Sequence, residues 1–190
     1  MLPSRVPGTF FILPLVLLAT MAAPAGAQSL AQPNSWTVTP FIGASTGVSG
    51  ANTDNSLGLG VGIGYDLTSN LGFEGELGHL FDVAGNDANL DWSVTNVSGN
   101  VLYHFDVQHV TPYVTFGLGF ERSNLDFKNP DPAALTIPSS TEVAYNFGGG
   151  VKYRLNDNLI VRGDLRRFQA VDLAPDHWRL YGGVVFDLKR

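Results

Sequence analysis

The sequence predicts an all-β fold: an eight-stranded antiparallel up-and-down transmembrane β-barrel, preceded by a cleavable signal peptide. The clearest support is residues 57–66, where every odd position from Leu57 to Tyr65 is large and apolar and every even position from 58 to 64 is glycine. In a helix each of those glycines would cost about 1 kcal/mol. In a strand the same pattern makes one face entirely apolar, and its length suits a tilted membrane-crossing strand of about 9–11 residues.

Composition limits the classes of protein that fit. Charged residues make up 15% of the 190 residues, against about 25% in a typical soluble domain. The formal net charge of −6 gives no electrostatic support for nucleic-acid binding. The chain has no cysteine, so disulfides, thiolate catalysis and a lipoprotein anchor are all excluded.

The N-terminal segment has the three parts of a signal peptide. Arg5 supplies a positive charge, residues 10–21 are almost wholly apolar, and Ala25-Gly26-Ala27 is a small-residue cleavage site. The alternative is a membrane-anchoring helix, which needs about 20 apolar residues. This apolar segment is shorter than that and contains Pro14. We expect a signal peptide over residues 1–27, a short polar leader over 28–35 and a barrel over 36–190.

Eight segments of the mature chain alternate apolar and polar residues and are predicted as strands: 36–48, 57–66, 71–81, 92–105, 112–121, 141–155, 159–168 and 177–188. The connections are long after the first, third, fifth and seventh segments and short after the others. Short periplasmic turns and longer external loops are typical of outer-membrane barrels. The longest connection, 122–140, is proline-rich and offers four apolar side chains as contacts for a partner: Leu125, Phe127, Leu135 and Ile137.

Aromatic residues gather at the two ends of these predicted strands, as membrane interfaces favour. The group expected at the short-turn end is Trp36, Tyr65, Tyr103, Phe105, Tyr153 and Phe186. The group expected at the long-loop end is Phe81, Trp92, Phe120, Tyr145 and Trp178.

The inward faces carry a set of charges that we expect to meet. Eight strands enclose a space just wide enough for side chains. Charges held there must be paired, because an unpaired buried charge is expensive. The predicted lumen cluster joins the third and seventh segments, with a lysine from the sixth and room supplied by the glycines of the second: Glu74, Glu76, Lys152, Arg162, Asp164 and Arg166. It can be interpreted as a structural plug, which we favour, or as an ion gate.

Residues 36–188 resemble the small outer-membrane β-barrel family of the OmpA transmembrane-domain type. The last segment, Tyr-Gly-Gly-Val-Val-Phe-Asp-Leu, is similar to the C-terminal assembly signal of such barrels, with its marks at Tyr181, Gly183, Phe186 and Leu188. The Lys189-Arg190 tail departs from the aromatic ending of many members. The resemblance implies a monomer in the cell outer membrane, in contact with outer-membrane lipid and lipopolysaccharide and with the barrel-assembly machinery.

The function expected from the sequence is a non-enzymatic barrel, structural or surface-interacting, with no catalytic, cofactor or metal site. One alternative is a conduit for small apolar or other small solutes, and another is a soluble lipocalin-like secreted barrel. A third is a lipid A-modifying barrel enzyme, although none of its candidate histidines stands in a His-x-Ser arrangement: His79, His104, His109 and His177.

Overall fold

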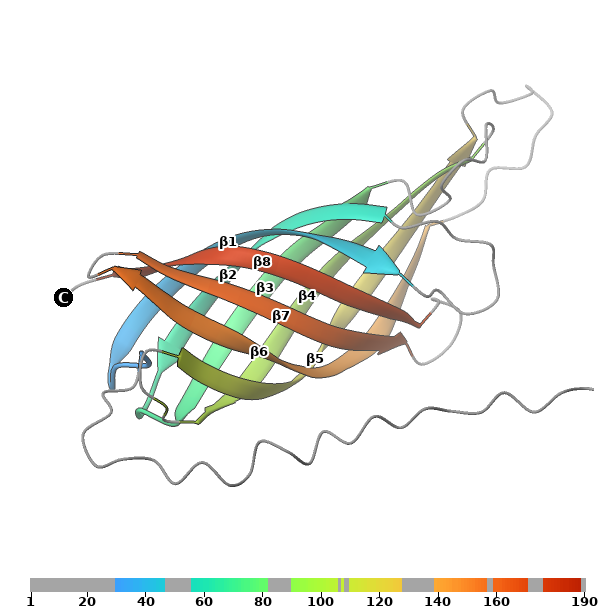
Figure 1. The fold of residues 1–190 in the computed structure, drawn as a ribbon. Coiled ribbons are helices and arrows are strands. Elements are labelled where there is room, and N and C mark those ends of the chain that lie inside the picture. The colour runs from blue at the N-terminus through green and yellow to red at the C-terminus, as the bar shows by residue number, and fades with distance from the viewer. Residues whose placement is uncertain are drawn as a thin grey trace, which may run out of the picture.

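The computed structural model describes residues 30–46, 56–81, 90–105, 107, 110–127, 139–156, 159–170 and 176–188. They form a closed barrel in which each strand pairs with the next and β1 pairs with β8, every pair being antiparallel (Figure 1). The eight-stranded all-β prediction is confirmed. The described ranges contain no helix long and apolar enough to cross a membrane. The predicted signal peptide, 1–27, lies outside them.

The strand bounds agree with the sequence at β3 and β8 and differ elsewhere, most of all at β5. The strands are β1 Ser35–Thr46, β2 Ser56–Asp66, β3 Leu71–Phe81, β4 Leu90–His104, β5 Val110–Phe127, β6 Ser140–Asn156, β7 Leu159–Ala170 and β8 His177–Leu188. We call the end with the short connections, such as residues 67–70, the turn end, and the opposite end the loop end.

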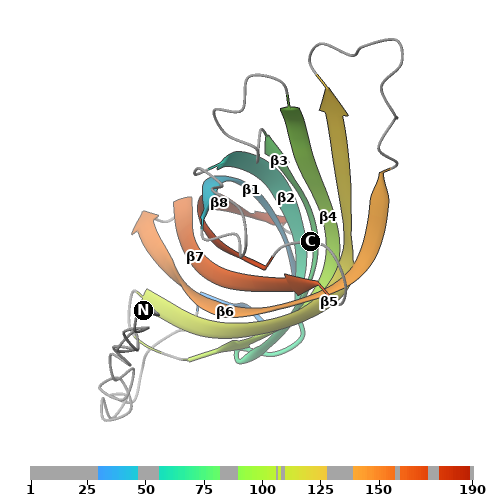
Figure 2. The same ribbon diagram turned by 90° about the vertical axis from the view of Figure 1, so that its right-hand side faces the viewer.

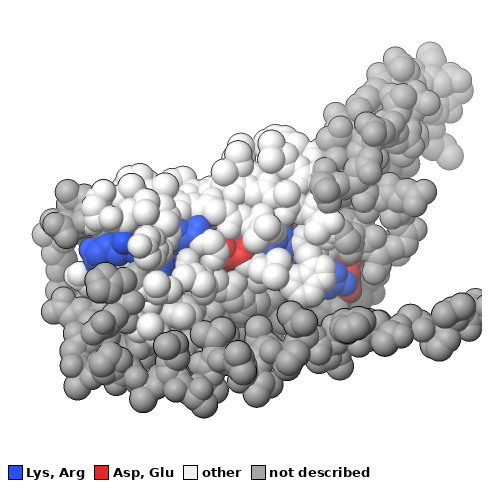
Figure 3. All heavy atoms as spheres, in the orientation of Figure 1, with Lys and Arg blue, Asp and Glu red and all other residues white. Residues whose placement is uncertain are grey.

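The outward face is apolar and the inward face polar over most of the wall. Large apolar side chains such as Leu57, Val97, Phe116 and Leu180 point outward and are exposed, whereas Glu74 and other polar residues are buried inside. On the face shown in Figure 3 the described part of the wall is mostly uncharged, with charged residues in small separate patches. An apolar exterior around a polar interior is the pattern of a barrel that stands in lipid.

The strands β4, β5 and β6 extend past their neighbours at the loop end (Figure 2). Two expectations are wrong here. Arg122–Phe127 belong to β5, paired with β4 up to Leu90 and Phe127, and are not part of a loop. Trp92 faces inward against the buried pair Leu80 and Val94. It therefore does not contribute to the aromatic group that was expected at the membrane interface of the long-loop end.

On β4 the polarity of the two faces reverses along this extension. Outward positions on β4 change from Val97 to Thr95 and Ser93, while inward Val94 is buried and apolar. Trp92 and Val94 of β4 therefore form a small apolar cluster with Leu80 of β3 above the polar lumen, and the outer face of β4 suits water here. Residues 128–138 of the predicted recognition loop lie outside the described residues, as do the side chains of Leu125 and Phe127.

The described end of the predicted leader closes the turn end of the barrel. Leu30 and Ala31 are buried, and Leu30 packs against the inward side chains of Ile160 and Val185. The backbone N–H of Leu30 donates to Thr111 Oγ1 over 3.3 Å, a contact that spans 81 residues of sequence. This part of the chain thus forms an apolar layer beneath the lumen charges.

Candidate functional site

The centre of the lumen is a network of buried carboxylates and guanidinium groups. β3 supplies Glu74 and Glu76 and β7 supplies Arg162, Asp164 and Arg166, from alternate positions that all point inward. The two strands lie on opposite walls of the ring, so the side chains meet across the axis. The structure therefore brings together five of the six residues in the predicted cluster.

Arg162 lies at the turn-end side of this network. Its guanidinium forms a bidentate ion pair with Glu74, in which Nη2 donates to Oε1 over 3.0 Å. Its Nε donates to Asp164 Oδ2 over 2.7 Å and to the Tyr113 hydroxyl over 2.6 Å, and Tyr113 in turn donates to Asp164. Bidentate, charge-assisted hydrogen bonds of this kind are the strong ones.

Arg166 is fully buried, at 0% exposure, and contacts three carboxylates. It donates to Glu76 over 3.0 Å and to Glu74 and Asp164 over 3.1 Å each. These contacts fix the guanidinium from both walls of the barrel.

Tyr113 was not in the predicted cluster, and neither were two members of this network from the last strand, Arg179 and Tyr181. Arg179 of β8 donates to Glu76 over 3.3 Å and to Asn96 over 2.8 Å, and the Tyr181 hydroxyl donates to Glu76 over 3.0 Å. The central network therefore contains three guanidinium groups and three carboxylates, so its net charge is zero. The sequence showed that Arg179 and Tyr181 occupy inward-facing positions of the last strand. Alternation alone does not say which charged side chains meet inside the barrel.

Lys152 lies in a different layer, nearer the turn end. Its Nζ is 3.9 Å from Asp66 Oδ2, and the ion pairs described for the central carboxylates do not include it. His104 Nδ1 is 4.0 Å from Asp66 Oδ1, and neither ring nitrogen of this fully buried histidine has a hydrogen-bond partner in the structure. The expectation that Lys152 joins the central cluster is therefore corrected to a pair with Asp66.

A third layer lies toward the loop end. Glu121 Oε1 is 3.7 Å from His177 Nε2 and 3.9 Å from Arg179 Nη2 and accepts no hydrogen bond in the structure. Phe168 stacks on the His177 ring at 5.2 Å, and the Arg179 guanidinium lies 4.1 Å from the Phe168 ring centroid. This layer is buried but much more loosely bonded than the centre.

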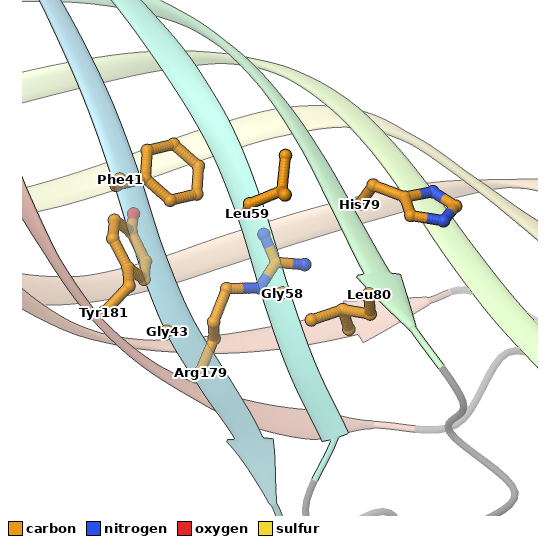
Figure 4. Close-up of a pocket in the computed structure, with 8 residues that line it drawn as sticks. All are labelled: Phe41, Gly43, Gly58, Leu59, His79, Leu80, Arg179 and Tyr181. Carbon is orange, nitrogen blue, oxygen red and sulfur yellow. The ribbon is translucent and has the colours of Figure 1, made fainter.

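The glycines of β2 make room mainly for other groups than the charged side chains. A Cβ on Gly62 would lie 3.0 Å from Glu74 Oε2, as expected, but one on Gly60 would meet the Phe41 ring and one on Gly64 the Thr37 hydroxyl. Phe41 breaks the alternation of β1 because its ring lies inside, beside Tyr181, with the ring centroids 4.6 Å apart (Figure 4). The small pocket drawn there lies between β1, β2, β3 and β8.

The candidate histidines are dispersed. His79 faces outward and contacts Thr95 over 2.8 Å, whereas His104 and His177 are buried in different layers of the lumen. His109 lies outside the described residues. Among the residues that the structure describes there is no group of three or more His, Cys, Asp or Glu able to hold a metal ion.

The four marks of the predicted assembly signal divide between the two faces of β8. Phe186 and Leu188 point outward and are exposed, whereas Tyr181 points inward to Glu76. A Cβ on Gly183 would lie 2.7 Å from the Pro40 carbonyl oxygen, so this glycine lets β8 approach β1 closely at the seam that closes the barrel.

The family is decided by a comparison of the sequence with family models. The model of the outer membrane protein beta-barrel domain matches residues 13–184. The chain belongs to this family. Its members' barrels stand in the outer membrane, so this protein is located there, in contact with outer-membrane lipid.

Curated relatives and solved structures are consistent with the assignment of this chain to the outer membrane protein beta-barrel domain. Outer membrane protein Omp38 of Acinetobacter baumannii strain ATCC 17978 is 29% identical over 124 residues, which are 62% of this chain and 34% of the relative. The chain thus spans about a third of the length of the curated relatives it matches.

Three solved barrels show the same fold at low sequence identity. Neisserial surface protein A is 18% identical with a TM-score of 0.63, covering 80% of this chain and 96% of that one. Ail, the attachment invasion locus protein of Yersinia pestis, is 14% identical with a TM-score of 0.57, covering 82% and 100%. The N-terminal barrel of Pseudomonas aeruginosa OprF is 20% identical with a TM-score of 0.51, covering 81% and 98%.

Proposed function

We propose that this protein is a non-enzymatic, structural barrel of the outer membrane whose lumen is plugged by its own side chains. The observation that carries the proposal is the charge-balanced network of Arg162, Arg166 and Arg179 with three carboxylates, which joins β3 to β7 and β8 across the axis. Apolar layers lie on both sides of it: Leu30 with Ile160 at the turn end, and Leu80 with Val94 at the loop end.

Ion flux across lipid vesicles tests the plug. We expect vesicles that contain the folded barrel to be as tight as empty vesicles, with a large open porin as the positive control. The paired variant Glu76→Ser with Arg166→Ser removes two opposite charges together and shortens both side chains, so it leaves a gap without an added net charge and should raise flux. Steady, discrete conductance by the unaltered barrel would overturn the plug and favour the conduit.

The same proposal excludes catalysis by the candidate histidines. His104 and His177 are buried, and His79 faces outward against a threonine, so these three stand in separate environments. Incubation of the purified barrel with lipopolysaccharide should leave the electrophoretic mobility of lipid A unchanged. A shifted lipid A band that disappears with His177→Ala would show an enzyme.

Assembly as a monomer through the last strand belongs to this proposal. Phe186 and Leu188 present an apolar outward edge at the end of β8, in the pattern expected of a signal read by the barrel-assembly machinery. A Phe186→Ala, Leu188→Ala variant should reach the outer membrane in reduced amount in cells. Equal amounts of variant and unaltered barrel would contradict this role.

Recognition at the loop end is a second candidate function, favoured by the extension of β4, β5 and β6 beyond the other strands. Rigid scaffolds with projecting connections often carry binding sites. Deletion of residues 130–139 should lower adhesion of cells that display the barrel, while heat-modifiable migration on gels shows that the barrel still folds. Unchanged adhesion by a folded deletion variant would rule this function out.

A further inference from the structure

A row of four polar side chains crosses the outer face of β3, β4, β5 and β6. The register pairs His79 with Thr95, Thr95 with Arg122, and Arg122 with Thr141, so they lie side by side on consecutive strands. The His79 Nδ1 and Thr95 Oγ1 atoms are 2.8 Å apart. We call these four residues the polar row.

The polar row lies where the wall leaves the hydrocarbon. Two positions toward the turn end, the same outward faces carry exposed apolar side chains: Leu77, Val97, Phe120 and Val143. On the inward face of β3 and β4 the change is opposite, because Leu80 and Val94 form a buried apolar pair at this level, whereas β5 keeps the buried Glu121. The outward change from apolar to polar side chains therefore places the row at the boundary between lipid tails and headgroups.

Arg122 gives the row its charge. The side chain is exposed, its Nε donates to Asn124 Oδ1 over 3.3 Å, and its Nη2 donates to Ser139 Oγ over 3.1 Å. Both acceptors are neutral, and the ion pairs among the described side chains include no carboxylate on Arg122. A guanidinium has five N–H donors in a fork that matches phosphate, so this one keeps both charge and donors for a ligand.

The neighbours of Arg122 suit sugar hydroxyl groups. Thr95 and Thr141 flank it in the row, and Asn124 and Ser139 lie beyond it on the loop-end side. We propose that the polar row binds the phosphate-bearing sugar headgroup of an outer-leaflet glycolipid, with Arg122 on the phosphate. The inference rests on the proposed function of an outer-membrane barrel, with the loop end outside the cell as the predicted external loops require, and does not depend on whether the lumen is plugged.

The barrel contains a matched control for this site. Arg167 of β7 also points outward near the loop end, but it donates to Asp176 over 3.0 Å and lies 5.6 Å from the Trp178 ring centroid. A carboxylate already neutralises it, so it should add little to the binding of an anion.

The test measures binding of fluorescently labelled lipopolysaccharide to the purified barrel in neutral detergent micelles. Arg122→Gln should bind about tenfold more weakly, as expected for the loss of one charge-assisted contact. Arg167→Gln should bind as the unaltered barrel does. Heat-modifiable migration confirms that each variant is folded before its affinity is compared.

Ligand variants identify the chemistry that is bound. Lipopolysaccharide stripped of its phosphates should bind the unaltered barrel as weakly as intact lipopolysaccharide binds Arg122→Gln. Phosphatidylglycerol and inorganic phosphate should compete poorly, since they lack the sugars. The proposal is overturned if Arg122→Gln binds normally, if both arginine variants weaken binding equally, or if phosphatidylglycerol competes as well as lipopolysaccharide. None of these results bears on the flux measurement that tests the plug.

Discussion

The centre of the lumen and its loop-end layer use the same kinds of side chain but hold them differently. In the centre, Arg166 reaches three carboxylates at 3.0–3.1 Å. In the loop-end layer, Glu121 stands 3.7 Å from His177 and 3.9 Å from Arg179, and one of its oxygens accepts no hydrogen bond. Burial alone therefore does not make a charge structural. What distinguishes the centre is that charges from different strands also lie within hydrogen-bond distance of one another, so each one restrains two strands.

The largest effect should come from removing the guanidinium that the centre shares among three acids. Arg166→Met should lower the free energy of unfolding by about 3–5 kcal/mol, because it leaves buried carboxylates without a partner. Urea unfolding in lipid vesicles measures this. Arg167→Met, at the part-exposed outward pair with Asp176, should cost less than about 1 kcal/mol. Equal losses for the two variants would contradict the contrast between centre and surface.

The apolar layer beneath the centre should contribute the next largest effect. Leu30→Ala removes the side chain that packs on Ile160 and Val185 and should cost about 2 kcal/mol, the low end for a buried leucine, because a chain end can relax. The same unfolding assay applies. Leu30→Met keeps the volume and should be nearly neutral, so a loss as large as that of Leu30→Ala would show that packing is not the cause.

Gly62, a glycine beside the central network, can be used to measure how tightly the lumen is packed there. Gly62→Ala would place a Cβ 3.0 Å from Glu74 Oε2 and should cost about 1 kcal/mol, the low end for overpacking. Gly163 faces outward with nothing within 4 Å of an added Cβ, so Gly163→Ala should be neutral or slightly stabilising. If both alanines have the same effect, the lumen has space that the described contacts do not account for.

The smallest effect is expected in the loop-end layer. Glu121→Gln keeps the shape and removes the charge of a group whose Oε1 accepts no hydrogen bond, so it should change the free energy of unfolding by less than about 1 kcal/mol. Glu74→Gln is the matched change in the centre and should cost clearly more, because it weakens a bidentate pair with Arg162. The difference between the two glutamine variants measures the contrast directly.

Alternation along the strands was enough to predict the closed sheet and the inward side of the central charges. It could not predict which charges meet, because that depends on the tilt and stagger of all eight strands. Lys152 therefore meets Asp66, and Arg179 joins Glu76. Alternation also missed the end of β5, since beyond Phe120 the outward positions become polar while the strand continues. Trp92 was misjudged for a related reason: an aromatic ring can fill a lumen that also has glycines, as the rings of Trp92 and Phe41 both do.

Pro40 has a consequence for the order in which the wall is completed. The register between β1 and β8 skips Thr39 and Pro40, and proline has no N–H to donate across this junction. The junction also joins the first strand to the last, so it carries the greatest loop-closure entropy of the eight. We expect β1 and β8 to pair last as the sheet inserts into the membrane, and their junction to open first when the barrel unfolds.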